Sequence, residues 1–205
     1  MNINGIVLAA GLSSRMKVFK PFLKLNGKTI IENSIDSMFS SGVKKVIVVL
    51  GYRGNEVEEF LKDKYDPLRI VFTYNHKYLE TDMLTSIKIG ISALGNCDAF
   101  YILPGDMPVI NTTTFIKVKE DMIKTNAMIA FPTINGYRKH PPLISKDLIN
   151  YIINFNSNDG LRGLWKLFDD KIVNVAVDDL GCIMDADTKE DYNKLIDYIK
   201  EEKIS

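Results

Sequence analysis

The sequence predicts an α/β fold, in which a mostly parallel, Rossmann-like sheet is flanked by helices in three layers. Short apolar runs rich in β-branched residues recur along the chain, and segments with helical spacing of apolar side chains separate most of them. This alternation is typical of a parallel sheet that is covered on both faces. With 205 residues and neither an internal repeat nor a proline-rich linker, the chain is expected to form a single domain over residues 1–205.

The expected elements follow in chain order. The apolar runs predict strands at 3–9, 45–50, 69–74, 99–103 and 127–131. The first helix is expected to begin near Thr29, and Thr188 with Asp191 has the form of a helix cap. The buried faces of three helices are expected at these residues: Ile31, Ile35, Met38 and Phe39; Val57, Phe60 and Leu61; Tyr192, Leu195, Ile196 and Ile199.

The segment at about 132–181 has a different character. Turn sequences interrupt the alternation there, among them Asn135-Gly136 and Asn158-Asp159-Gly160. We expect an inserted subregion on the acceptor side of the sheet. Ligands of open α/β sheets bind beyond the carboxyl ends of the strands, so the loops after the first and fourth strands are predicted to face one crevice.

Composition excludes several function classes. Lysine plus arginine and aspartate plus glutamate number 26 each, so no overall basic field favours nucleic acid. The opening residues lack a cationic segment, and no apolar run approaches the ~18 residues of a membrane span, so a cytoplasmic protein without membrane contact is expected. Cys97 and Cys182 lack a Cys-x-x-Cys spacing, and His76 and His140 are isolated, which disfavours a zinc site.

The connection after the first strand is the first candidate functional segment. It extends from Gly11 to the first helix near Thr29, well beyond the usual ~4 to 6 residues. Its hydroxyl-bearing and cationic side chains are Ser13, Ser14, Arg15, Lys17 and Lys20. Together with backbone amides, these groups are suited to bind a polyanion such as a phosphate chain. The alternative is a solvated surface loop with a chance basic cluster.

Two carboxylate clusters are candidate metal ligands. Asp106 comes directly after the fourth strand, in Pro104-Gly105-Asp106-Met107-Pro108, and magnesium prefers such oxygen donors. Asp106 can equally cap the helix expected at Asn111 or Thr112, or stabilise the Pro-Gly-Asp turn. Asp185 is a second candidate ligand, whereas Asp187 beside a helix start can simply favour the helix dipole.

These motifs resemble those of the MobA-like nucleotidyltransferases, in the family's order and over most of the chain. The matching residues are Leu8, Ala9, Ala10, Gly11, Ser13, Arg15, Met16 and Lys20, then Gly105 to Pro108, then Asp185, Asp187, Thr188, Glu190, Asp191 and Tyr192. A Gly-Tyr-Arg-Lys-His-Pro-Pro-Leu segment at 136–143 and an Asp-Gly-Leu-Arg segment at 159–162 resemble the family's acceptor side. Lys17 and Lys139 stand where the family has glycine.

The resemblance implies the nucleotide-diphospho-sugar transferase type of fold and a magnesium-dependent reaction of a nucleoside triphosphate with a phosphorylated acceptor. It implies catalytic roles for Arg15, Lys20 and Asp106, with magnesium held by Asp106 and Asp185. The implied nucleotide-binding residues are Leu8, Ala9, Ala10, Gly11, Ser13, Arg15, Lys20, Thr85, Ser86 and Asp106, and the implied acceptor-binding residues are Arg138, His140 and Arg162 with Lys139. For the Thr81–Ser86 segment, helix capping by Thr81 or Asp82 is an equal alternative.

The order Leu-Ala-Ala-Gly with His-Pro-x-Leu looks like the cytidylyl branch, because the guanylyl branch has a second glycine at the position of Ala10. That branch transfers CMP from CTP to molybdopterin and releases pyrophosphate, which implies transient contact with maturation proteins of molybdenum hydroxylases. Two alternatives stay open. One is a guanylyl- or sugar-phosphate nucleotidyltransferase of the same fold, and the other is a non-catalytic nucleotide-binding regulatory module, which Lys17 and Lys139 favour.

Overall fold

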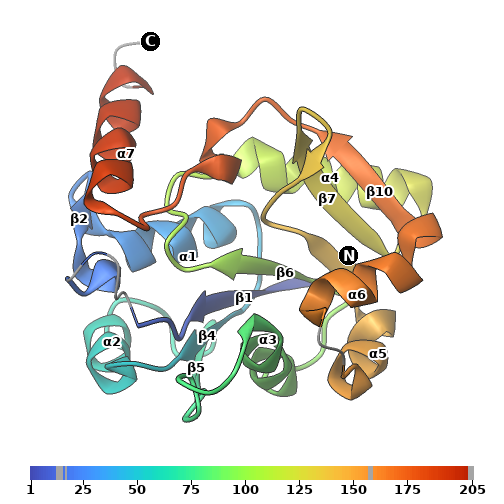
Figure 1. Ribbon diagram of the computed structural model, residues 1–205, viewed down its shortest axis with the longest axis horizontal. Coiled ribbons are helices and arrows are strands. Elements are labelled where there is room, and N and C mark those ends of the chain that lie inside the picture. Colours follow the sequence, from blue (N-terminus) through green and yellow to red (C-terminus); the bar gives the residue numbers. More distant parts are fainter. Residues whose placement is uncertain (13–15, 17, 157–158, 203–205) are drawn as a thin grey trace.

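A computed structural model describes residues 1–12, 16, 18–156 and 159–202, and it has the predicted α/β architecture (Figure 1). Its eight-stranded sheet has the order β10-β7-β9-β6-β1-β4-β5, with β8 paired to β7. The strands are β1 (Ile3–Ala9), β4 (Val46–Leu50), β5 (Ile70–Tyr74), β6 (Ala99–Pro104), β7 (Ile129–Ile134), β8 (Tyr137–Arg138), β9 (Leu143–Ser145) and β10 (Ile172–Ala176). A separate hairpin consists of β2 (Lys24–Leu25) and β3 (Lys28–Thr29).

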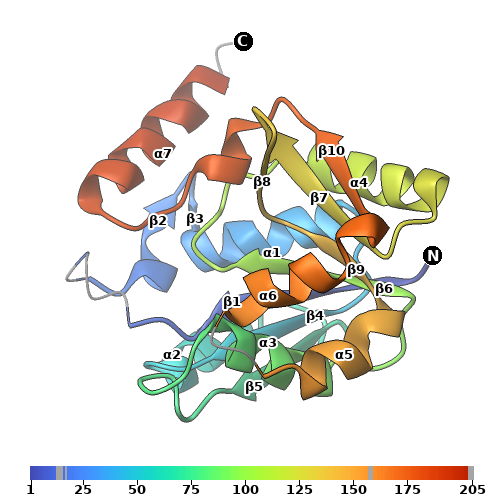
Figure 2. The ribbon, with the colours of Figure 1, turned by 45° about the vertical axis from the view of Figure 1, so that its right-hand side comes forward.

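Helices cover both faces of this sheet. They are α1 (Ile30–Ser40), α2 (Gly54–Leu61), α3 (Met83–Ser92), α4 (Thr112–Thr125), α5 (Ile149–Asn154), α6 (Gly160–Leu167) and α7 (Lys189–Glu202). Figures 1 and 2 show α1 and α4 on one side of the sheet and α3, α5 and α6 on the other. Within the described ranges, no helix is both long enough and apolar enough to cross a bilayer.

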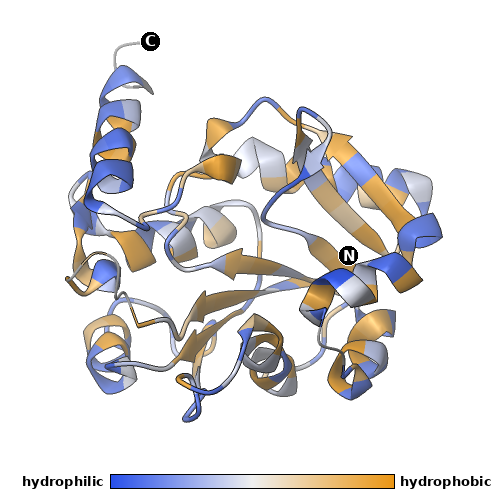
Figure 3. Cartoon of the chain, in the orientation of Figure 1, coloured by the Kyte–Doolittle hydropathy of each residue, from blue (hydrophilic) through white to orange (hydrophobic). Residues whose placement is uncertain are grey.

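The core consists of two layers, one on each face of the sheet, as the continuous apolar character of the central strands requires (Figure 3). On one side, Ile35 and Met38 of α1 pack with Phe115 and Val118 of α4. The opposite layer contains apolar residues of α3, α5 and α6, among them Ile87, Ile152 and Leu164. A third cluster joins α7 to the β2–β3 hairpin and comprises Leu25, Ile30, Ala186 and Leu195.

All five predicted strands are present, and β1 has the predicted bounds. The segment 132–181, expected as an inserted subregion, contributes β8, β9 and β10 to the main sheet. β9 pairs antiparallel with both β6 and β7, so it lies inside the sheet. β9 is only 3 residues long and follows Pro141-Pro142. Its apolar run is therefore too short for the sequence pattern to predict a strand.

A buried carboxylate fixes the start of α1. Thr29 and Glu32 form a capping box: Glu32 accepts hydrogen bonds from the Thr29 amide (2.7 Å) and hydroxyl (2.6 Å), and its carboxylate also pairs with Lys64 at 2.9 Å. Burial acts to raise the pKa of Glu32, but the Thr29 hydrogen bonds and Lys64 outweigh it and lower the pKa to about 2. The folded protein therefore favours the ionised form of Glu32.

This low pKa predicts a specific loss of stability in acid. The stabilisation by Glu32 is complete above the unfolded-state pKa of about 4.5 and disappears as the pH falls through about 2. We expect Glu32→Gln to lower the free energy of unfolding by about 2 kcal/mol at pH 7, with a difference that shrinks as the pH falls from about 5 to 2. Urea unfolding across this range measures it. Glu59→Gln, at an exposed pair with Lys62, is the control; a pH-independent Glu32→Gln effect would contradict the prediction.

Candidate active site

The parallel register brings the ends of several strands together at one edge of the sheet. Leu8 of β1 is aligned with Pro104 of β6, and Leu50 of β4 is aligned with Tyr74 of β5. The Gly105 amide donates to the Leu8 carbonyl at 2.9 Å, which fastens the loop after β6 to the end of β1. The predicted crevice between the loops after the first and fourth expected strands is therefore confirmed.

A cavity of about 300 Å³ occupies this crevice. It is lined by Leu8, Ala9, Ala10, Gly11, Lys20, Pro21, Tyr78, Thr81, Asp82, Met83, Ser86, Pro104, Gly105 and Asp106. We call it the first cavity. Of the expected nucleotide-binding residues, Ser13 and Arg15 lie outside the described residues, as does Lys17. Thr85 is the one described member that does not line the cavity, and its hydroxyl donates to Asp82 at the start of α3.

Lys20 is the electrostatic centre of the site. Its ammonium lies 2.5 Å from a carboxylate oxygen of Asp187 and 3.3 Å from one of Asp106, and its side chain is only 10% exposed. Asp106 comes from the end of β6 and Asp187 from the segment before α7, so the lysine joins three distant parts of the chain. Asn111 occupies the N-cap position of α4, which removes the capping alternative for Asp106.

A third carboxylate lies beside this pair. Burial raises the pKa of Asp185, and the neighbouring charges of Asp187 and Asp106 raise it further against the opposing effect of Lys20. The Ala186 amide donates to the Asp106 backbone carbonyl at 3.0 Å, so this acidic segment is held against the end of β6. Negative charge therefore exceeds positive charge among these four side chains, an arrangement that favours a further cation.

The donor set of the site limits how a metal ion can bind there. Among the described residues, no group of three or more histidine, cysteine, aspartate or glutamate side chains is arranged to hold one. Magnesium, however, commonly binds proteins through one or two carboxylates and completes its shell with water and substrate phosphates. Asp106 and a neighbouring aspartate fit that mode. The lysine ammonium already lies against the Asp106 carboxylate, so a divalent ion and Lys20 would compete for it.

A second, larger cavity of about 980 Å³ adjoins the first. It contains the three residues expected on the acceptor side, Arg138, His140 and Arg162, and it shares Asp82 and Met83 with the first cavity. The remaining lining residues are Leu84, Ile102, Phe131, Lys139, Pro142, Asp159, Gly160, Leu161, Trp165, Lys166 and Asp169. We call it the second cavity.

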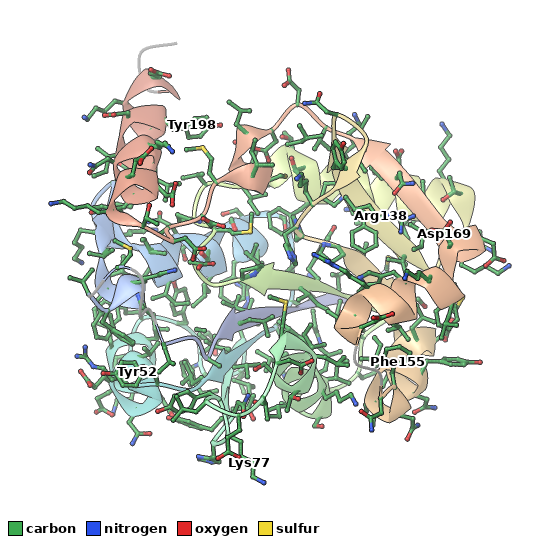
Figure 4. All side chains as sticks on the ribbon, viewed as in Figure 1. Tyr52, Lys77, Arg138, Phe155, Asp169 and Tyr198 are labelled. Carbon is green, nitrogen blue, oxygen red and sulfur yellow. The ribbon has the colours of Figure 1, made fainter. Side chains whose placement is uncertain are left out.

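Its chemistry combines aromatic surface with positive charge. The rings of Phe131 and Trp165 meet edge to face with centroids 5.6 Å apart. Arg138 pairs with Asp169 at 2.7 Å, and Figure 4 shows these two side chains together at one side of the molecule. Burial lowers the pKa of His140 despite the Ile102 carbonyl and Asp106, so at neutral pH this ring offers hydrogen bonds and no charge.

Several lining residues had not been predicted. Tyr78 and Pro21 line the first cavity, and Trp165 lines the second. Asn75, which is buried and contacts both Thr81 and Ser86, directly follows β5. The rule that ligand-binding groups follow the carboxyl ends of parallel strands, applied to this strand as well, would have identified Asn75. No local sequence pattern predicts the contact between Asp187 and Lys20, because 167 residues separate the two partners.

Residues 5–175 match the family model of the MobA-like NTP transferase domain. The chain belongs to this family, which makes it a nucleotidyltransferase of the MobA-like type. It is 30% identical over 190 residues to the molybdenum cofactor cytidylyltransferase of Escherichia coli K12, covering 93% of each protein.

Solved structures show the same fold. A nucleotidyl transferase from Methanothermobacter has a TM-score of 0.81 at 24% identity, covering 98% of this chain and 99% of the other. The Mycobacterium tuberculosis protein Rv0371c in complex with manganese has a TM-score of 0.72 at 19% identity, covering 96% of this chain and 99% of the other. At these identities the likeness establishes the nucleotide-diphospho-sugar transferase fold alone.

The position of Lys20 predicts how the protein responds to a divalent ion. Lys20→Met leaves Asp106 and Asp187 without the ammonium that separates them, so Mn²⁺ should bind the variant more tightly than the wild type. We expect millimolar Mn²⁺ to raise the thermal midpoint of the variant by about 2 to 4 °C more than that of the wild type. Lys28→Met, at the surface pair with Asp36, is the control. Equal shifts in all three proteins would argue against competition.

Proposed function

We propose that the protein is a magnesium-dependent cytidylyltransferase that transfers CMP from CTP to molybdopterin and releases pyrophosphate. The observation that carries this proposal is the joining of two cavities: one lined by the glycine loop, Lys20 and Asp106, the other by cationic and aromatic side chains. Two substrates that meet at a shared wall suit a transfer reaction. The cytidylyltransferase of Escherichia coli, similar over 93% of this chain, supports the choice of CTP and molybdopterin.

In this proposal the first cavity holds the nucleotide. The segment Ala9, Ala10 and Gly11 borders it at the end of β1, where backbone amides can approach phosphate closely. Lys20, with Arg15 from the preceding loop, is assigned to the triphosphate and offsets the charge of the departing pyrophosphate. Lys20 then exchanges its two carboxylate contacts for phosphate contacts when the nucleotide binds.

Asp106, together with Asp185, is the proposed magnesium ligand. When bound, the ion would neutralise charge on the phosphate oxygens. The Asp106 carboxylate becomes available to a metal when the ammonium of Lys20 moves from it toward phosphate. This exchange gives the protein a physical reason to take up nucleotide and magnesium together.

The second cavity is assigned to the acceptor. An oxygen of the acceptor phosphate attacks the α-phosphorus of the nucleotide; one P–O bond forms, and the bond to the pyrophosphate oxygen breaks. No covalent intermediate with the protein is needed, because positioning and charge neutralisation supply most of the rate in phosphoryl-type transfers. Arg162 and Lys139 suit the acceptor phosphate, and the Trp165 ring suits a planar heterocycle such as a pterin.

The deciding experiment is a pyrophosphate-release assay with magnesium and each of the four common nucleoside triphosphates. Molybdopterin and a panel of sugar phosphates are the acceptors. We expect release from CTP that depends on molybdopterin. Release with GTP or with a sugar phosphate would move the protein to another member of the same fold. If no combination of substrates releases pyrophosphate but nucleotide still binds, the protein is the non-catalytic regulatory module.

The same assay tests Asp106. We expect Asp106→Asn to lower metal-dependent turnover at least 100-fold and to leave the urea midpoint nearly unchanged, because the amide keeps the shape of the side chain but not its charge. Asp178→Asn, at an exposed position after β10, is the matched control. Wild-type turnover by Asp106→Asn would remove the metal role assigned to this residue.

Arg162 tests the acceptor assignment separately. Its side chain lines the second cavity only, so Arg162→Gln should raise KM for the acceptor about tenfold while KM for CTP stays within about twofold. Steady-state kinetics with each substrate varied in turn measure both constants. Lys171→Gln, an exposed cation outside both cavities, is the control. A rise in KM for CTP alone would place the acceptor elsewhere.

A further inference from the structure

A buried amide lies behind one wall of the first cavity. Asn75 follows β5 and is 2% exposed. Its side-chain nitrogen donates to the hydroxyls of Thr81 (2.8 Å) and Ser86 (3.0 Å), both of which line the first cavity. Its backbone amide donates to the Leu50 carbonyl at 2.8 Å and extends the pairing between β4 and β5. The side chain is thus held between the sheet and the cavity wall.

The orientation of this amide follows from its partners. The Lys77 backbone N–H, which can only donate, lies 3.0 Å from Oδ1 of Asn75. The oxygen must therefore face Lys77, and the nitrogen must face Thr81 and Ser86. Both hydroxyls consequently receive a hydrogen bond from Asn75 and must direct their own protons elsewhere.

The two hydroxyl protons have different destinations. The Thr81 hydroxyl donates to the Lys77 carbonyl at 2.9 Å, so its proton is used within the turn. Ser86 is 6% exposed on the first turn of α3, and in the described part of the chain its hydroxyl donates to no acceptor. Ser86 also lines the first cavity, which gives its proton an open direction. The Ser86 hydroxyl proton is thus available to a ligand in the first cavity.

We propose that Asn75 is a positioning residue that directs the Ser86 hydroxyl proton toward the nucleotide base. The inference rests on the proposed nucleotide role of the first cavity and adds a rule of selection to it. A donor at this wall favours a base that places a carbonyl oxygen there, as a pyrimidine does with O2, over a base that places an N–H or C–H group there. Asn75 acts through Ser86 and does not touch the nucleotide.

An isosteric exchange at position 75 reverses the hydrogen-bond polarity. In Asn75→Asp, one carboxylate oxygen still accepts from Lys77, but the other now accepts from Ser86, whose lone pairs then face the base carbonyl. We expect the dissociation constant for CTP to rise about tenfold or more, with kcat changing by less than about threefold. Isothermal titration of CTP with magnesium gives the dissociation constant, and the pyrophosphate assay gives kcat.

A double-mutant cycle separates positioning from general damage. Ser86→Ala alone should also weaken CTP binding about tenfold, and Asn75→Asp added to Ser86→Ala should weaken it no further, because the route through Ser86 is already lost. Ser92→Ala is the matched control, since Ser92 donates to Lys88 on the exposed side of the same helix. If Asn75→Asp does not fold in a urea titration, Asn75→Ala replaces it, and the same non-additivity is required.

The outcomes are distinguishable. If the wild type does not bind CTP, the proposed function fails and the inference fails with it. If the wild type binds CTP but Ser86→Ala binds it equally well, or if the effects of the substitutions at 75 and 86 are additive, the inference alone is overturned. Tighter binding of a nucleotide with an N–H group on that edge by Asn75→Asp would be direct support.

Discussion

The parallel pairing of β1 with both β4 and β6 is the constraint on which the site depends. It places the ends of these strands side by side, and the loops that follow must then approach each other closely. A Cβ added to Gly51 would lie 2.5 Å from the Ala10 carbonyl oxygen, and one added to Gly105 would lie 3.1 Å from the Leu8 carbonyl oxygen. Glycine at both positions therefore allows β1, β4 and β6 to end around one cavity.

Ion pairs and a backbone hydrogen bond attach the segment before α7 to this edge of the sheet. The ammonium of Lys20 contacts the carboxylates of Asp106 and Asp187, and the Ala186 amide binds the Asp106 carbonyl. The short apolar cluster beneath α7 supports these contacts through Leu25 and Leu195. The charged residues that are assigned to catalysis thus also hold the segment before α7 against the end of β6.

The features that depend on local sequence pattern could be predicted from the sequence. The buried strands have continuous apolar runs, and the glycine loop and Asp106 follow such runs directly, so both the sheet and the first cavity could be predicted. Features that depend on contacts between distant residues could not. The three-residue β9 gains its stability from two neighbouring strands, and the Lys20–Asp187 pair spans 167 residues.

Asp82 and Thr85 follow the capping alternative, since their side chains form a hydrogen bond with each other at the start of α3. The roles of Ser13 and Arg15, which lie outside the described residues, stay predictions.

The first turn of α3 has a consequence for how the two cavities communicate. Asp82 and Met83 belong to the walls of both, so no displacement of this turn can alter one cavity and leave the other unchanged. A ligand that displaces this turn from one side changes the wall of the other cavity, and binding at the two cavities is then thermodynamically linked. Such linkage is reciprocal: if a ligand in one cavity changes the affinity of the other cavity by some factor, the second ligand changes the affinity for the first by the same factor. One shared turn is thus a route by which the two ligands can influence each other without a separate regulatory element.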